Sequence, residues 1–350
     1  MWAAGVLRRR AARFSPDGPL RYISVGNSVQ THTFRLGKGV PMPRDELAPE
    51  LAAVVEAMDG WRDARRIDAE YISGGITNRN YRVVVDGTTY FVRLAGERTG
   101  LLGIDRAHEK AALETAAGLG IAPWVVAFLP DQDSLVTTWI DGETLEAADV
   151  REPEVLAPLV DALRAFHDAG EIPGRFHVSE IAQRYRDHAT DHDVDVPDAY
   201  DELLAVTRQV EDAFAKHPIA DRPCHNDLLS ANFMRGRDGV AIVDFEYAGM
   251  GDPFFDLGNL SVNNEFDDAL DHALLERYFG EATPPRVARL KLMRIVSDFR
   301  EAMWGVIQQG ISSLDIDYVE YANQHFERCL TQVRDGRYDD WLRTAADAPV

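Results

Sequence analysis

The spacing of apolar residues predicts a helix and then strands in the first part of the chain. Between residues 45 and 58, apolar residues recur every three or four positions, as on one face of a helix. Further along, Tyr81, Val83 and Val85 take every second position, which is the period of a strand. The sequence "DGTT" at 86–89 then predicts a tight hairpin turn into a second strand, "YFVRL".

After the second strand, the spacing of apolar residues predicts a helix and then two short strands. Residues 104–120, "IDRAHEKAALETAAGLG", contain strong helix formers and end at glycines, which predicts a helix. Two short apolar runs at 124–130 and 134–140 predict two further strands. An order of strand, strand, helix, strand, strand is typical of a small α+β lobe.

The remainder of the chain has a mainly helical pattern. Residues 154–170, 200–217 and 285–335 carry apolar side chains at helical spacing. The run 186–202 between two of these segments is rich in aspartate. We expect a solvated loop there rather than a metal site, because the acidic residues lack the ordered spacing of hard-cation sites.

These elements together predict an α+β fold with two lobes. The N-lobe, residues 46–140, would hold a small antiparallel sheet, and the C-lobe, residues 141–350, would be mostly helical. Residues 1–45 would form an N-terminal extension that we expect to be poorly ordered. Its arginines follow a short apolar stretch, which is the reverse of the order in a secretory signal.

Composition narrows the classes of function. The net charge of -21 argues against general nucleic-acid binding, since phosphates would be repelled. The two cysteines, Cys224 and Cys329, form neither a disulfide framework nor a zinc pattern, so we expect a reducing, cytoplasmic location. No apolar run approaches the length of a membrane span, and we expect no membrane insertion.

Two segments of the C-lobe carry the strongest candidate chemistry. They are "CHNDLLSANFM" (224–234) and "VAIVDF" (240–245), an apolar run that predicts a buried strand. The turn-forming "RGRDG" between them allows a hairpin, which would bring Asn232 and Asp244 to one end, close to Asp227. Carboxylate and amide oxygens suit magnesium held between nucleotide phosphates, and a second carboxylate can accept a proton from a substrate hydroxyl.

The order of these residues matches the template for phosphoryl transfer. That template has a base aspartate, an asparagine five residues later and a metal-binding aspartate at a strand end. Asp227, Asn232 and Asp244 stand in that order. Upstream, the glycine-rich "SGGITNRNY" lies between two predicted strands and allows backbone amides to approach phosphates.

The template also needs a basic residue on the third strand, paired with a glutamate of the following helix. In this chain the basic residue is Arg93, and the glutamate is Glu109, with Glu114 as its competitor. An arginine can serve here because its planar guanidinium binds phosphate and carboxylate through two parallel hydrogen bonds.

These motifs resemble those of the choline/ethanolamine kinase family, within the wider aminoglycoside-phosphotransferase-like kinases. The resemblance rests on "HNDLLSANFM", "IVDFEYAGMGDPFFDLGN", "ISGGITNRNYRV", "FVRLAG" and "WGVIQQGISSLDIDYVEYANQHF". It implies a bilobal protein-kinase-like fold, ATP and magnesium (Mg2+) as cosubstrate and metal, and transfer of the γ-phosphate to a small-molecule hydroxyl.

The resemblance also implies a role for each matching residue. Asp227 would be the catalytic base, and Asn232 and Asp244 would hold magnesium. His225 and Asp256 would hold the catalytic loop through hydrogen bonds rather than react. The residues that bind the nucleotide would be Ser73, Gly74, Gly75, Thr77, Asn78 and Asn80 in the loop over the phosphates, Arg93 with Glu109, and the backbone of Thr138, Trp139 and Ile140.

The acceptor site is implied by the same resemblance. An aromatic cage with carboxylates nearby binds a quaternary ammonium well. Trp304 matches one tryptophan of the family's choline box, but Glu301 stands where a second tryptophan is common, which would suit a primary amine or an amine with further hydroxyls. Trp304 is also compatible with helix packing, and Glu301 with exposure to solvent. The other residues expected to face the acceptor are Glu246, Tyr247, Glu265, Phe266 and Tyr318.

Three functions therefore remain to be compared. The first is a kinase for choline, ethanolamine or a related amino alcohol. The second is an aminoglycoside-type antibiotic kinase, whose polycationic acceptors the acidic chain would favour. The third is a nucleotide-binding pseudokinase, which would lack a catalytic residue, whereas Asp227, Asn232 and Asp244 are all present. Monomer and homodimer both stay open.

Overall fold

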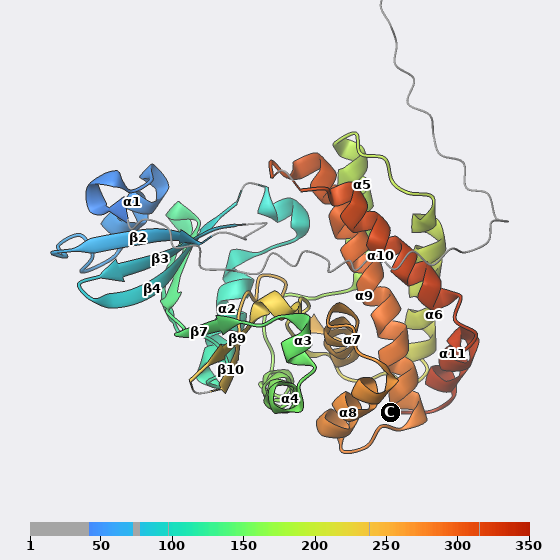
Figure 1. Ribbon diagram of the computed structural model, residues 1–350. Helices are drawn as coiled ribbons and strands as arrows, with labels where there is room; N and C mark the ends of the chain where they lie inside the picture. The colour runs from blue at the N-terminus through green and yellow to red at the C-terminus, as the bar shows by residue number, and fades with distance from the viewer. Residues whose placement is uncertain (1–41, 73–77, 97, 238, 315) are drawn as a thin grey trace, which may run out of the picture. The chain divides into compact units, whose positions relative to one another are not determined.

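The computed structural model gives the fold of most of the chain (Figure 1). The residues that it describes are 42–72, 78–96, 98–237, 239–314 and 316–350. The expectations for the extension up to residue 41 and for the loop residues Ser73, Gly74, Gly75 and Thr77 lie outside these residues. The described chain begins with a strand, β1, and a short 3-10 turn, within the range expected to be poorly ordered.

The first part of the described chain is an antiparallel sheet of six strands with two helices. The sheet has the order β1-β2-β3-β4-β6-β5. The hairpin predicted at 86–89 is confirmed: Asp86 and Gly87 both have positive φ, 46° and 92°, as a two-residue primed turn requires. The elements are β1 (Met42–Pro43), α1 (Pro49–Ala57), β2 (Ile67–Ile72), β3 (Asn78–Val85), β4 (Thr88–Ala95), α2 (Arg106–Gly118), β5 (Val125–Leu129) and β6 (Ser134–Thr138).

Helix α1 covers the sheet and closes a small core of its own. Leu51 and Val54 on α1 are fully buried and belong to the same apolar cluster as Val83 and Val92 of the sheet. The helix predicted at 45–58 is thus confirmed, although it begins at Pro49. Proline is favoured in the first turn because its missing N–H would lack an intrahelical partner there.

The second part of the described chain is mostly helical. Its elements are β7 (Gly142–Thr144), α3 (Ala147–Val150), α4 (Pro153–His167), α5 (Val178–Asp191), α6 (Ala199–Phe214), β8 (Arg222–Cys224), β9 (Phe233–Gly236), β10 (Gly239–Ile242), β11 (Gly249–Gly251), α7 (Pro253–Asn263), α8 (Asp268–Phe279), α9 (Pro284–Ile311), α10 (Tyr318–Val333) and α11 (Tyr338–Asp347). Strand β7 pairs with β9, and β9 pairs with β10. The expected α+β fold, with a small antiparallel sheet and a mainly helical remainder, is confirmed, while the lobe boundary at residue 140 stays a prediction.

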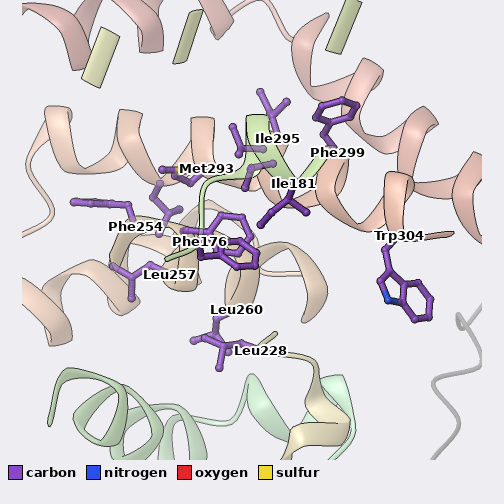
Figure 2. Packing of buried hydrophobic residues seen from close by; sticks show 14 of the residues in the cluster. Phe176, Ile181, Leu228, Phe254, Leu257, Leu260, Met293, Ile295, Phe299 and Trp304 are labelled. Atoms are coloured by element: carbon purple, nitrogen blue, oxygen red, sulfur yellow. The ribbon is translucent and has the colours of Figure 1, made fainter. Parts of the chain in front are cut away.

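Helix α9 is the central element of the helical part. It is 28 residues long and packs against α5, α7, α10 and α11 (Figure 1). Its apolar residues fill the main core, where Met293 lies beside Phe254 and Leu257 of α7 (Figure 2). Neither α9 nor any other described helix has an apolar stretch that could cross a membrane.

The aspartate-rich run 186–202 is only partly the loop that the sequence indicates. Helix α5 continues to Asp191 and α6 begins at Ala199, so the connection is 192–198. The helix extends into the run because Tyr185 and Ala189 continue its buried face. Among the described residues, the group of three His, Cys, Asp or Glu side chains close enough together to share a metal ion is His167, Cys224 and Asp256, which lie outside this run.

Gly258 sets the distance between α7 and α9. A Cβ added at this position would lie 2.7 Å from the backbone carbon of Met293, which is closer than two helices can tolerate. We expect Gly258→Ala to lower the free energy of unfolding by about 1–3 kcal/mol, because the helices must separate. Denaturant titration measures this loss.

Gly118, at the end of α2, provides the matched control. A Cβ there would meet no atom within 4 Å, so Gly118→Ala should leave the stability unchanged or raise it by roughly 0.5–1 kcal/mol. Equal losses in both variants would contradict the packing role of Gly258.

Candidate active site

The predicted hairpin of β9 and β10 brings the candidate metal ligands together. Ile242 is the register partner of Phe233, and the N–H of Val243 donates to the carbonyl of Asn232 at 2.9 Å. Asn232 precedes β9, and Asp244 follows β10 by two residues. The two side chains therefore start from the same end of the hairpin, as the sequence indicates.

Asn232 also contacts the candidate base. Its Nδ2 donates to the backbone carbonyl of Asp227 at 2.8 Å and to the carboxylate Oδ2 at 3.1 Å. Both amide hydrogens of Asn232 are thus directed at Asp227, and its amide oxygen lies on the other side of the side chain. An oxygen in that position is available for a cation.

Asp244 has the conformation and surroundings of a cation ligand. Its φ is 66°, a left-handed value that is uncommon for a residue with a side chain. The side chain is 38% exposed, and Arg93 lies 3.8 Å away. Although the side chain is only partly buried, loss of hydration within the protein, together with the carboxylate of Glu246, raises the pKa of Asp244 well above its usual value. A hard cation bound by Asp244 and the Asn232 oxygen would relieve this repulsion, so the donor set fits magnesium.

The turn that carries Asp227 is held by one buried carboxylate. Asp256, in the first turn of α7, accepts the N–H groups of His225 and Asn226, each at 2.7 Å. His167 contacts the same carboxylate at 3.0 Å. Asn226 has a φ of 66°, and two bonds from a charged acceptor offset the strain of that left-handed conformation. The bracing role expected of Asp256 is consistent with this geometry.

His225 joins the same turn to the strand end. Its Nε2 donates to the carbonyl of Val243 at 3.0 Å, and its Nδ1 accepts the N–H of Asp227 at 3.3 Å. Burial lowers the pKa of His225, so the ring stays neutral and can both donate and accept. These contacts agree with a structural role and not with that of a nucleophile.

A cavity of about 380 Å³ lies beside these residues. Arg93, Glu109, Asn78 and Asn80 from the sheet part line one side of it. Asn232, Asp244 and Met234 from the helical part line the other. The segment Thr138, Trp139 and Ile140, expected to bind adenine, also contributes to the wall. The cavity therefore collects the predicted nucleotide-binding residues that lie within the described chain.

Arg93 and Glu109 form the ion pair that the sequence predicts. Both Nη atoms of Arg93 donate to the carboxylate of Glu109, one of them at 2.7 Å. The pair is buried, with side chains 7% and 2% exposed. Burial acts to raise the pKa of Glu109, but the guanidinium groups of Arg93 and Arg106 hold it below its usual value.

Arg106 belongs to the site although the sequence interpretation omits it. Its Nη1 contacts Glu109 at 2.9 Å and Glu246 at 3.0 Å, and its Nη2 donates to Asn78 at 2.8 Å. Asn78 in turn donates to Glu246 at 3.0 Å. The sequence could have indicated Arg106 through its spacing of three residues from Glu109 on α2, because residues i and i+3 share a helix face. The negative charge of Glu246 is thus compensated by Arg106 at the start of α2.

Aromatic residues of α9, α10 and the segment after β10 form a cluster. The indole N–H of Trp304 donates to the hydroxyl of Tyr247 at 3.0 Å. Tyr318 and Tyr321 of α10 meet the Trp304 ring edge to face, at centroid distances of 5.9 and 5.5 Å. Tyr321 is a second residue that the sequence interpretation omits; only the helical spacing of three from Tyr318 indicates it. Trp304 is 5% exposed, so it packs and also lines this cluster.

Arg300 and Glu301 connect the aromatic cluster to the candidate base. The buried guanidinium of Arg300 lies 3.5 Å from the carboxylate of Asp227 and 4.2 Å from the ring of Tyr247. Glu301 is 2% exposed, so the reading of it as a solvent-exposed position is wrong. Burial raises the pKa of Asp227 to about 7, against the opposing charge of Arg300.

Two residues expected to face the acceptor have other surroundings. Glu265 follows α7 with its side chain 65% exposed, and it forms an ion pair with Arg151 at 3.1 Å. Phe266 is 3% exposed and, among the described residues, has no part in the ring contacts that join Trp304 to Tyr318 and Tyr321. The structure therefore brings Tyr247, Trp304 and Tyr318 together but leaves Glu265 and Phe266 out of their cluster.

Comparisons with known proteins identify relatives along most of the chain. A model of the phosphotransferase enzyme family matches residues 68–290. The chain is 27% identical to ethanolamine kinase 2 of Mus musculus, over 82% of this chain and 83% of the relative. It is 26% identical to protein LicA of Haemophilus influenzae, over 67% and 72% of the two chains.

Solved structures give the same grouping. A choline/ethanolamine kinase family protein from Mesorhizobium loti is 29% identical with a TM-score of 0.74, over 85% of this chain and 99% of that one. The aminoglycoside phosphotransferase APH(4)-Ia is 17% identical with a TM-score of 0.57, over 83% and 99%. The second likeness shows a shared fold alone.

Asp256 offers a direct test of how the catalytic turn is held. We expect Asp256→Asn to lower the free energy of unfolding by about 2–4 kcal/mol, because two bonds to a buried charge become bonds to a neutral amide or are lost. The amides of His225 and Asn226 should also exchange with solvent faster in hydrogen–deuterium exchange.

Asp267→Asn is the matched control. Asp267 caps α8 by accepting the N–H of Leu270, and asparagine caps helices about as well, within about 0.5 kcal/mol. Unchanged exchange at His225 and Asn226 in the Asp256→Asn variant would contradict the bracing role.

Proposed function

Because the chain belongs to the phosphotransferase enzyme family, we propose that it is a kinase that transfers the γ-phosphoryl group of ATP to the hydroxyl of a small amino alcohol, such as ethanolamine or choline. The observation that carries this proposal is the convergence of Asp227, Asn232 and Asp244 at one end of the β9–β10 hairpin, beside the cavity. The relatives named as ethanolamine kinases support the class of acceptor.

In this proposal Asp227 is the general base. Its carboxylate takes the proton of the acceptor hydroxyl while that oxygen forms a bond to the γ-phosphorus. The bond from phosphorus to the bridging oxygen breaks, and ADP leaves with its electron pair. Asn232 holds the Asp227 carboxylate through its amide N–H, which fixes the direction of that oxygen.

The metal and the phosphates have their own residues in this proposal. Asp244 and the amide oxygen of Asn232 would hold magnesium, which neutralises charge on the phosphate oxygens when bound. Arg93 lies between Glu109 and Asp244 and would contact the phosphates from the sheet side. The backbone of Thr138 to Ile140 would bind adenine.

The acceptor side favours a small amine with a single positive charge. Arg300 compensates the charge of Glu301, and Arg106 compensates that of Glu246. Arg300 lies against both Glu301 and Asp227, so these three groups together carry one net negative charge next to the aromatic cluster, and aromatic faces attract one ammonium group. A polycationic aminoglycoside would need several free carboxylates, so the cluster of Trp304 with three tyrosines supports the amino-alcohol reading.

The two cysteines bear on the location of the protein. Cys224 and Cys329 are both free and buried, which supports the proposal of a reducing, cytoplasmic environment. Burial raises the pKa of each thiol well above its usual value, so neither is a reactive thiolate, and we assign no chemical role to either.

The central prediction concerns the base. With ATP, magnesium and a panel of amino alcohols, the wild-type protein should phosphorylate at least one acceptor. Asp227→Asn should lower kcat on the order of a hundred- to ten-thousandfold, because the amide cannot take the proton, while ATP binding measured by calorimetry stays largely in place. An Asp227→Asn variant with intact turnover would contradict the assignment.

A second prediction concerns the metal. Asp244→Asn removes a charged ligand, so the magnesium concentration for half-maximal rate should rise by at least about tenfold, and chelation should abolish activity. Asp141→Asn is the control, since Asp141 lies close to the cavity wall but is 78% exposed and paired with Arg237. Equal magnesium dependence in both variants would remove Asp244 from the metal site.

A further inference from the structure

Glu301 is surrounded by protein groups and not by open space. Its Oε1 accepts a hydrogen bond from Nη1 of Arg300 at 2.5 Å, and its Oε2 accepts one from the hydroxyl of Tyr321 at 3.0 Å. The residue is 2% exposed. With both carboxylate oxygens engaged, Glu301 is poorly placed to bind the ammonium of an acceptor, which is the role that its position in the chain suggests.

The contact between Arg300 and Glu301 needs a third residue to hold it. Consecutive residues on a helix point about 100° apart, so side chains at i and i+1 do not ordinarily face each other. Tyr321 reaches from α10 to the second oxygen of Glu301 and keeps the carboxylate turned toward Arg300. The pair is therefore a product of the packing of α9 against α10.

Arg300 in turn depends on Glu301 for its position. Its Nη1 makes the polar contacts, with Glu301 at 2.5 Å and with Asp227 at 3.5 Å. Among the described residues, its Nε and Nη2 have no hydrogen-bonding partner. The faces of Tyr247 at 4.2 Å and of Phe176 at 5.9 Å provide further support. Without Glu301, the guanidinium would keep the longer contact with Asp227 and the two ring contacts.

These contacts form a circuit that closes at Arg300, and Arg300 joins it to the candidate base. It runs from Asp227 to Arg300, Glu301 and Tyr321, then through the edge-to-face contact to Trp304, and back through the Trp304–Tyr247 hydrogen bond to Arg300. The circuit links the aromatic cluster to the carboxylate that takes the proton in the proposed reaction.

We infer that Glu301 is a positioning residue and does not bind the amine of the acceptor. It holds Arg300 against Asp227 and, through Tyr321, orients the aromatic cluster. This inference rests on the proposed function, because Asp227 is the base only if the chain is a kinase. The inference predicts that loss of Glu301 lowers the turnover rate and leaves the affinity for the acceptor unchanged. Loss of a residue that binds the acceptor directly would instead weaken that affinity.

Steady-state kinetics of Glu301→Gln and Arg300→Met test this role. In each variant kcat should fall by about ten- to a hundredfold, since a shift of the base by a fraction of an ångström is costly, while KM for the acceptor changes by less than about threefold. The double variant should lose no more than the worse single one, because both substitutions break the same contact. Arg300→Lys should retain more activity than Arg300→Met.

Two further variants keep the result interpretable. Tyr321→Phe removes one hydroxyl and should lower kcat in the same direction by about two- to fivefold, even if Glu301→Gln folds poorly. Arg328→Gln breaks a comparable pair with buried Asp298 between α9 and α10, outside the circuit. It should lower the melting temperature with unchanged kcat and KM.

Three outcomes would overturn the inference. They are a rise in acceptor KM of more than about tenfold at unchanged kcat in Glu301→Gln, losses that add in the double variant, and a crystal structure of Glu301→Gln in which Arg300 stays on Asp227. The crystal structure needs no activity, so the inference can fail or stand by itself. Failure of the wild-type protein to phosphorylate any amino alcohol would instead overturn the proposed function.

Discussion

The two hydrogen bonds to the carboxylate of Asp256 from the turn that carries Asp227 are the contacts on which the candidate site depends. They hold Asn226 in a left-handed conformation, and that conformation directs Asp227 toward Asn232. Asp256 can do this only because α7 is fixed, and α7 is fixed by its close packing on α9 at Gly258. The long buried helix α9 thus supports α7, α7 carries Asp256, and Asp256 holds the turn that carries Asp227.

Buried carboxylates of the site are paired with arginines, although the chain as a whole is strongly acidic. The chain carries a net charge of -21, yet its buried carboxylates Glu109, Glu246 and Glu301 each have an arginine partner. Burying a charge without a partner is costly. Asp227 and Asp244 instead have longer arginine contacts, at 3.5 Å from Arg300 and 3.8 Å from Arg93, and each of these arginines is already paired with a glutamate. In the proposed reaction, this weaker compensation leaves Asp227 available for a proton and Asp244 for a cation.

Much of the fold could be predicted because local patterns carry it. The "DGTT" turn, the β9–β10 hairpin and the helices of the second part follow from period and turn chemistry, which act between near neighbours in the sequence. The aspartate-rich run shows the limit: Tyr185 and Ala189 extend the buried face of α5 into it, and composition alone suggested a loop. Charge content is a weaker guide than apolar spacing, because packing decides where a helix ends.

The sequence by itself indicated the candidate base, the candidate metal ligands and Arg93, since their order and spacing match a known chemistry. The structure decided between the two glutamates, because it pairs Arg93 with Glu109 and Glu114 with Lys110. Only the tertiary structure decided the surroundings of the acceptor side. Arg106, Arg300 and Tyr321 gain their roles from partners on other elements, and Glu265 loses its expected role by facing solvent beside Arg151. Contacts between distant segments depend on how helices pack in three dimensions, and a linear pattern does not contain that information.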